Sequence, residues 1–101
     1  NVPNKNFIEC LPENIVVEVP GILNKSGVKG VKLENYPSNF GSLLNNQVST
    51  IQLTTDAVIN KSKDSVYLAL LADPIVDNAK SAEKLLDTML VFQKDYLEYL
   101  K

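Results

Sequence analysis

The sequence has 101 residues, a net charge of −2, one cysteine and no histidine or tryptophan, and all ten of its basic residues are lysines. This length predicts one domain with its own core, and a slightly acidic chain without arginine argues against nucleic-acid binding. No apolar run approaches the ~18 residues of a membrane span, which argues against membrane insertion. Because the single cysteine, Cys10, allows no disulfide within the chain, a reducing compartment such as the cytoplasm is the simpler expectation.

The first third of the chain predicts a loop followed by a β-hairpin. Residues 1–14 are rich in proline and asparagine, which favours a turning path with a possible short strand at Phe7–Ile8. The β-branched run that begins Ile15–Ile22 predicts a strand. The turn residues of Asn24–Gly27 follow it, so we expect this strand to pair antiparallel with Val28–Leu33.

The remainder of the chain has helical periodicity. Apolar residues recur at helical spacing and predict helices over about 38–60, 64–72 and 81–100, the last capped by Ser81. The apolar arcs of these helices are wide and need burial on more than one side. The sequence therefore predicts an α+β fold in which an antiparallel hairpin, about residues 15–33, is packed by three helices.

The chain offers no complete site for catalysis, a metal or a cofactor. It has one cysteine, no histidine and carboxylates scattered along helix faces, which do not make a metal cluster. Its four glycines never form a phosphate-binding loop. Cys10 is interpreted as a small apolar filler beside Leu11 and Pro12 rather than a ligand or nucleophile, since nothing nearby supplies a base.

Two polar features near the start leave alternatives open. Asn1 and Asn4 stand in a proline-stiffened segment, where their amides either make turns or hold sugar hydroxyls. Glu18 stands among valines and either pairs with a hairpin lysine such as Lys29 or Lys32, or orients polar groups of an adjoining lobe.

Four stretches in order, NVPN, LPENIVVEVP, TTDAVINKSKDSVYLALLADP and KDYLEYL, resemble the C-terminal region of family-4 glycoside hydrolases. The resemblance runs essentially end to end. It is strongest to the α-galactosidase and α-glucosidase branch, and the 6-phospho-β-glucosidases share the outline. It implies part of the C-terminal lobe of the fold that these enzymes share with lactate and malate dehydrogenases.

The resemblance also implies an activity. Enzymes of this family use bound NAD to oxidise the sugar hydroxyl at C3, which acidifies the C2 proton. A base removes that proton and the glycosidic bond breaks by elimination. Water then adds, and the hydride returns from the cofactor to C3. A divalent metal, commonly manganese, polarises the sugar oxygens. The Rossmann-like NAD domain, the metal ligands and the base of the family all lie upstream of the residues present here.

We thus expect residues 1–101 to form one C-terminal lobe of a larger enzyme. The lobe contributes to the substrate cleft and to a homo-oligomeric interface, and it is inactive alone. Its partners are its own N-terminal NAD domain and a sugar, with Asn1, Asn4 and Glu18 near the substrate. NAD and manganese belong to the parent. An independent protein-interaction module without catalysis is the alternative, and a small sugar-binding domain is a third.

Overall fold

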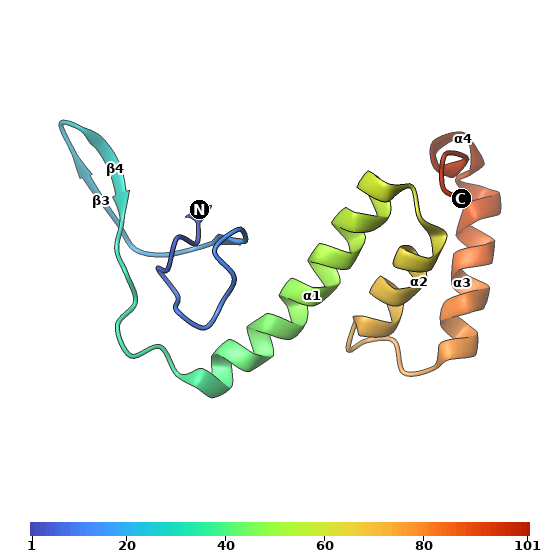
Figure 1. Ribbon diagram of the computed structural model, residues 1–101, viewed down its shortest axis with the longest axis horizontal. Coiled ribbons are helices and arrows are strands. Elements are labelled where there is room, and N and C mark those ends of the chain that lie inside the picture. The colour runs from blue at the N-terminus through green and yellow to red at the C-terminus, as the bar shows by residue number, and fades with distance from the viewer. The chain divides into compact units, whose positions relative to one another are not determined.

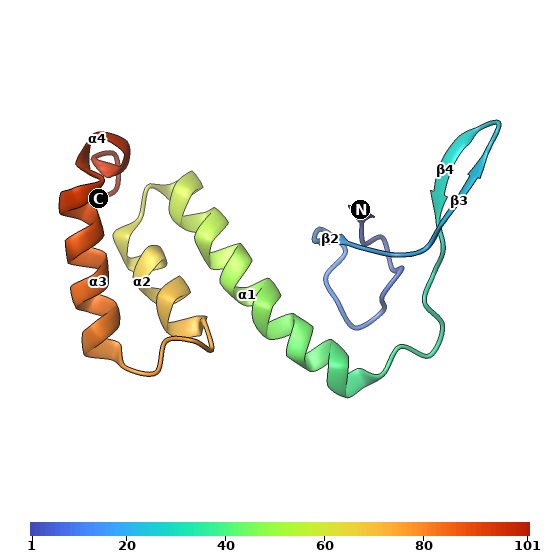
Figure 2. The ribbon, with the colours of Figure 1, turned by 180° about the vertical axis from the view of Figure 1, so that it is seen from behind.

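The computed structural model describes residues 1–101 as four short strands and four helices (Figures 1 and 2). The chain divides into two compact units, residues 1–45 and 46–101, called unit 1 and unit 2 below. None of the helices combines the length and the apolar character that a membrane crossing requires. In chain order the elements are β1 (Val2–Pro3), β2 (Val16–Val17), β3 (Gly21–Asn24), β4 (Gly27–Gly30), α1 (Ser38–Asn60), α2 (Lys63–Ala72), α3 (Ala79–Phe92) and α4 (Lys94–Leu97).

Unit 1 begins with a two-stranded pair that closes a loop. β1 and β2 are antiparallel, with Val2 opposite Val17 and Pro3 opposite Val16. The backbone N–H of Asn4 continues the ladder by donating to the carbonyl of Ile15 at 2.8 Å. Val17 is buried whereas Val16 is exposed, as strand alternation requires. The residues between Pro3 and Ile15 are therefore held as a closed loop.

The predicted turn is confirmed, and β3 and β4 form an antiparallel hairpin around it. Asn24 lies opposite Gly27, leaving a two-residue connection, and Gly27 has a φ of 111° that favours glycine. The Oδ1 atom of Asn24 accepts from the backbone N–H of Ser26 at 2.9 Å. The turn is thus fixed by its own side chains.

The predicted partner of the first strand is wrong. Ile15–Ile22 was expected to pair with Val28–Leu33 as one long strand, whereas β2 pairs with β1 and only β3 pairs with β4. Pro20 explains the break, because it has no N–H to donate and separates the two short strands. Phe7–Ile8, the possible extra strand, lies in bends of the loop.

The α+β class with its hairpin and three long helices is confirmed, but the hairpin is less covered than predicted. Its apolar side chains, Ile22, Leu23 and Val28, are between 57% and 79% exposed. At its base, a Cβ on Gly30 would lie 2.8 Å from the ring of Phe7, so only glycine lets that ring approach the strand. The hairpin is therefore anchored at its base and open beyond it.

The helix boundaries follow the predictions closely in two of three cases. α1 spans 38–60 as expected, and α2 begins one residue early at Lys63, where Ser62 Oγ caps the N–H of Ser65 at 3.2 Å. The predicted third helix is two helices, α3 and α4, broken at Gln93, where φ is −108° and ψ is 27°.

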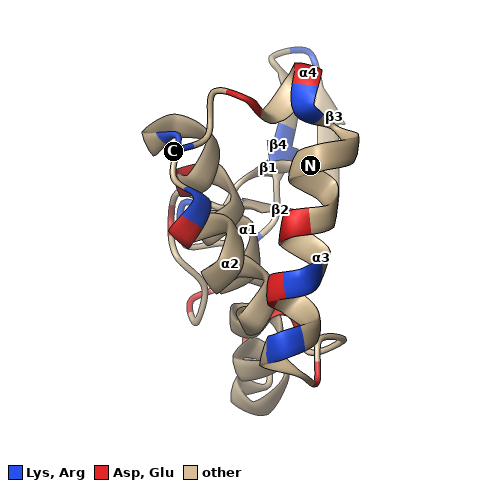
Figure 3. Ribbon diagram, turned by 90° about the vertical axis from the view of Figure 1, so that its right-hand side faces the viewer, with Lys and Arg blue, Asp and Glu red and all other residues tan.

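The cap of α3 also differs from the expected one. Asn78, not Ser81, is its N-cap, and Asn78 Oδ1 accepts from the N–H of Ser81 at 3.1 Å. Asparagine serves as well as serine at this position, and with the cap three residues earlier the helix begins at Ala79 instead of about residue 81. Basic and acidic residues alternate along α3, as Figure 3 shows, and this face of the helix is solvated.

The last residues of the chain pair with the connection between α1 and α2. The N–H of Lys101 donates to the carbonyl of Lys61 at 2.7 Å, and the N–H of Lys63 donates to the carbonyl of Lys101 at 2.9 Å. Leu100 is buried there. These bonds hold the end of the chain within unit 2.

Candidate functional site

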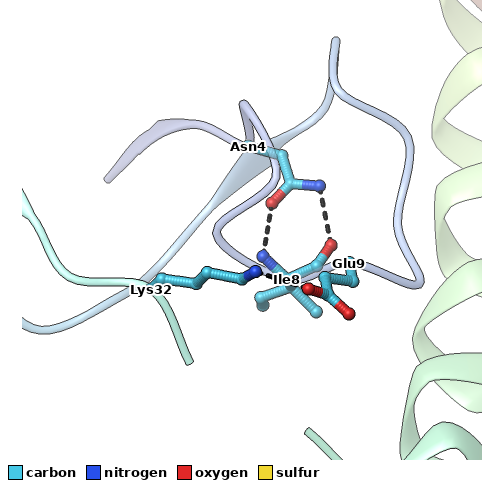
Figure 4. Close-up of polar contacts among 4 residues, drawn as sticks. All are labelled: Asn4, Ile8, Glu9 and Lys32. Atoms are coloured by element: carbon cyan, nitrogen blue, oxygen red, sulfur yellow. Dashed lines mark hydrogen bonds and ion pairs between the residues drawn. The ribbon is translucent and has the colours of Figure 1, made fainter. Parts of the chain in front are cut away.

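Asn4 organises the loop between β1 and β2 (Figure 4). Its side chain is 0% exposed. The Nδ2 atom donates to the carbonyls of Ile8 at 3.0 Å, Leu11 at 2.8 Å and Pro12 at 3.1 Å, while Oδ1 accepts from the N–H of Ile8 at 2.8 Å. One amide thus bonds four backbone groups of the turning chain, two of which, the carbonyl of Leu11 and the N–H of Ile8, have no backbone partner.

A tight turn with left-handed residues leads from Asn4 into the loop. Lys5 and Asn6 have φ values of 38° and 69°. The N–H of Phe7 donates to the carbonyl of Asn4 at 2.7 Å, which closes a four-residue turn. Asparagine tolerates this conformation better than lysine, so Asn6 suits its place while Lys5 depends on the bonds around it.

An ion pair joins this loop to the segment after β4. Lys32 Nζ donates to Glu9 Oε1, as Figure 4 shows. The hydrogen bond from Lys32, followed by its positive charge, lowers the pKa of the Glu9 carboxyl below 4.5. The bond to Glu9 likewise raises the pKa of Lys32 above 10.5. Both groups are therefore fully charged near neutral pH.

Beside Glu9 lies a concavity of about 400 Å³ with a mainly polar lining. Its walls come from Glu9 and Cys10 of the loop, from residues 33–36, and from Ser38 at the start of α1. Carboxylate, phenol, amide and hydroxyl groups here can donate to or accept from a polar ligand. Across the whole chain, no three His, Cys, Asp or Glu residues come together as a group that could hold a metal ion.

Cys10 packs on the first turn of α1, not beside Leu11 and Pro12 as an enclosed filler. The thiol is exposed, and a Cβ built on the buried Gly41 would lie 2.1 Å from its Sγ atom. Gly41 therefore provides the space that the thiol occupies. The contact joins the loop to the helix within unit 1.

The structure distributes the predicted site residues over different environments. Asn1 and Glu18 are exposed at the ends of β1 and β2, whereas Asn4 is buried in the loop. None of these three lines the polar concavity. The expected pairing of Glu18 with a hairpin lysine is wrong, because Lys32 pairs with Glu9 instead. Asn4 can act on a ligand only through the loop that it shapes.

Sequence reasoning missed the residues around the concavity. Glu9 and Lys32 are 23 positions apart, and neither period nor spacing signals that they meet. Asn35 has a φ of 55°, which fits a turn before α1. The Asn-Tyr-Pro sequence signals the turn but not the surface that it lines.

Unit 2 carries a second hollow, with different chemistry. Its volume is about 450 Å³, and its lining is almost wholly apolar. The walls come from the C-terminal half of α1, from α2 and α3, and from residues 97–100. Such a lining suits an apolar partner and offers almost nothing for sugar hydroxyls.

Comparison with known proteins identifies the family. The family described as "Family 4 glycosyl hydrolase C-terminal domain" matches residues 1–76, which is most of the chain. The chain belongs to this family. The matched residues include the whole of unit 1, with the polar concavity, and α2. They supply half of the residues that line the hollow in unit 2, and α3 and residues 97–100 supply the other half.

Curated relatives extend the match along the entire chain. An α-glucosidase of Erwinia rhapontici is 42% identical over 101 residues, all of this chain and 22% of the relative's own length. An α-galacturonidase of Thermoanaerobacterium saccharolyticum is 33% identical over 99 residues, covering 97% of this chain and 21% of that protein. A maltose-6'-phosphate glucosidase of Clostridium acetobutylicum is 30% identical over 95 residues, 94% of this chain and 22% of that protein.

The predicted resemblance to the C-terminal region of family 4 glycosidases is thus confirmed. The chain spans about a fifth of the length of the relatives it matches. No solved structure matches it significantly.

Proposed function

We propose that these residues form the C-terminal lobe of a family 4 α-glycosidase that hydrolyses O-glycosidic bonds with the help of NAD and a divalent metal, by the oxidation, elimination and addition route described above. The observation that carries the proposal is the family match over residues 1–76 together with relatives aligned over the full chain. Those relatives bear the names of α-glucosidase and α-galacturonidase, which supports an α-glycosidic substrate. The lobe alone is inactive in this proposal.

The residues of this chain do not fit a metal or NAD site of their own. They bring together no group of three His, Cys, Asp or Glu side chains, and the chain has no glycine-rich phosphate loop. We therefore assign NAD and manganese to the other four fifths of the enzyme, and we derive no reaction step from the residues present here. A cytoplasmic location for the whole protein is part of this proposal.

The contribution of this lobe is to form one wall of the substrate cleft. Asn1 and Glu18 are exposed at one end of the β1–β2 pair, and Glu18 has no ion-pair partner within the chain. An exposed carboxylate without a partner is free to orient polar groups of an adjoining lobe. Asn4 acts as a positioning residue, because its four hydrogen bonds fix the loop that β1 and β2 close.

The lobe also contributes to a homo-oligomeric interface in this proposal. Phe92 and Tyr96, at the end of α3 and in α4, are 80% and 77% exposed. Large aromatic side chains so exposed are typical anchors of subunit contacts. Sedimentation of the full-length protein as a monomer at high concentration would contradict this part.

The decisive test uses the full-length enzyme with nitrophenyl α-glycosides, manganese and a thiol reductant, with and without NAD. We expect hydrolysis that is lost when NAD is removed and restored when it is added back. Activity indifferent to NAD would refute the mechanism. A reading frame that begins directly before Asn1 would instead support the stand-alone interaction module.

Glu18 provides a finer test. In the full-length enzyme, Glu18→Gln is expected to lower kcat/KM without changing the free energy of unfolding, because the carboxylate has no ion-pair partner in the lobe. Glu13→Gln is the matched control, since Glu13 is exposed in the same segment and also forms no ion pair. Equal activity of the two variants would remove Glu18 from the cleft.

A further inference from the structure

The helices of unit 2 surround a hollow that their own side chains do not fill. The residues buried in this unit are mostly alanines, Ala57, Ala69 and Ala82. Larger side chains that line the hollow, Leu85 and Met89, stay 46% and 40% exposed. The hollow is a concavity of about 450 Å³ that is open to solvent, and its apolar lining is suited to receive apolar side chains from outside the unit.

The surface area of the chain agrees with a missing partner. Two separate compact units of these lengths would together expose about 6,900 Å² by the usual scaling of surface with mass. The chain exposes 7722 Å². The excess is on the order of 800 Å² for the whole chain, and the exposed apolar residues of the β3–β4 hairpin contribute to it together with the hollow of unit 2.

Carboxylates border the hollow on one side. Leu86 lines both the hollow and a neighbouring concavity of about 320 Å³. That concavity is also lined by Asp64, Glu83 and Asp87, with Lys63 as the one basic residue. The border is therefore acidic. It favours a partner that carries positive charge beside its apolar face.

We propose that the hollow holds an amphipathic helix from the part of the same polypeptide that precedes Asn1. The apolar face of this helix packs on Leu85 and Met89, and lysine or arginine along its edge faces Asp87. A helix seated in a groove presents side chains at positions i, i+3 or i+4, and i+7. Such a row supplies several aliphatic groups to the hollow between the helices.

The occupant is assigned to the same chain for two reasons. This chain is 22% of the length of its α-glucosidase relative and matches the C-terminal domain of the family, so most of the polypeptide lies before residue 1. A tethered segment also has an effective concentration on the order of millimolar, which outcompetes a second copy in dilute solution. The inference rests on the proposed function, in which the chain is one lobe of a longer enzyme.

The test places the photoreactive residue benzoylphenylalanine at position 89 of the full-length protein, followed by irradiation and peptide mass spectrometry. The expected product joins residue 89 to a peptide that precedes Asn1 within the same polypeptide. Position 84 is the matched control, because Lys84 is exposed on α3 and does not line the hollow. Position 85 provides a second site if the variant at position 89 does not fold.

Oligomers assembled from isotopically light and heavy subunits distinguish the two sources of a cross-link. A cross-linked product from position 89 that joins a light and a heavy subunit would overturn the proposal in favour of a second copy. If position 89 gives no cross-link that the control at position 84 does not also give, the hollow is an open groove and the proposal is overturned. The NAD test is independent. A cross-link within one chain together with activity indifferent to NAD would leave this inference standing and refute only the proposed mechanism.

Discussion

Substitution of Asn4 by alanine isolates the role of the buried amide. The change removes three donated hydrogen bonds and one accepted bond. Two of the four backbone groups keep another partner, because the carbonyl of Ile8 still accepts from Leu11 at 3.1 Å and that of Pro12 from Ile15 at 3.4 Å. The carbonyl of Leu11 and the N–H of Ile8 lose the partner that Asn4 provides. Both belong to buried residues.

The expected cost follows from these two orphaned groups. A buried polar group left without a partner costs about 1–3 kcal/mol, so the two groups together are expected to lower the free energy of unfolding of Asn4→Ala by about 2–6 kcal/mol. Asn4→Asp should cost at least as much, because a carboxylate cannot donate to the three carbonyls that surround Nδ2. Either change therefore loosens the loop while leaving the helices of unit 2 in place.

Denaturant unfolding of the full-length protein measures the loss, and hydrogen exchange locates it. Exchange of the Ile8 amide should accelerate in Asn4→Ala, while amides in α3 keep their protection. Asn14→Ala is the matched control, since Asn14 is exposed in the same loop and its change is expected to stay within about 0.5 kcal/mol. Equal stability of the two variants would refute the reasoning.

Three further predictions concern local contacts. Gly41→Ala is expected to lower the free energy of unfolding by about 1–3 kcal/mol because its Cβ meets the Cys10 thiol. In a Cys10→Gly background the same change should raise the free energy of unfolding by up to about 1 kcal/mol through helix propensity. Unfolding curves in which the effect of Gly41→Ala has the same sign in both backgrounds would contradict this. An NMR titration should place the pKa of Glu9 below 4.5, and Lys32→Met should return it to the ordinary range. The stability that Glu9 contributes is therefore present above the ordinary glutamate pKa and is lost as the pH falls through the lowered pKa. A Glu9 pKa that stays the same in Lys32→Met would contradict the pairing. Asn78→Ala should lower the free energy of unfolding by about 1 kcal/mol because it removes the N-cap of α3. Asn78→Ser should retain the cap. Equal melting temperatures of these two variants would show that the cap does not stabilise the helix.

The sequence predicts best where the determinants are local. The hairpin turn depends on residues 24–27 alone and was predicted from them, whereas the extent of the strands on either side was not. The helices 38–60 and 63–72 match their predicted spans to within one residue because periodicity and nearby breakers define both. The break at Gln93 has no proline or glycine to signal it, so one long helix was expected where two occur.

The loop that contains Asn4 shows why the rest of the site could not be predicted. Asparagines at positions 1, 4, 6 and 14 look alike in the sequence. Only the three-dimensional path of residues 8–12 decides which amide meets their backbone groups. A residue interpreted as a turn former or a sugar ligand is instead the centre of a buried network. The contact of Glu9 with Lys32 likewise depends on where the hairpin returns to the loop.

The wide apolar arcs of the helices have a physical explanation in unit 2. A helix that packs on one neighbour needs a single apolar stripe, and the alanines Ala69 and Ala82 let α2 and α3 pack in that way. The larger residues, Leu85 and Met89, then line the hollow instead of filling the contact. The pattern of small residues inside and large residues around an open hollow is therefore evidence that the core of unit 2 is completed by a partner.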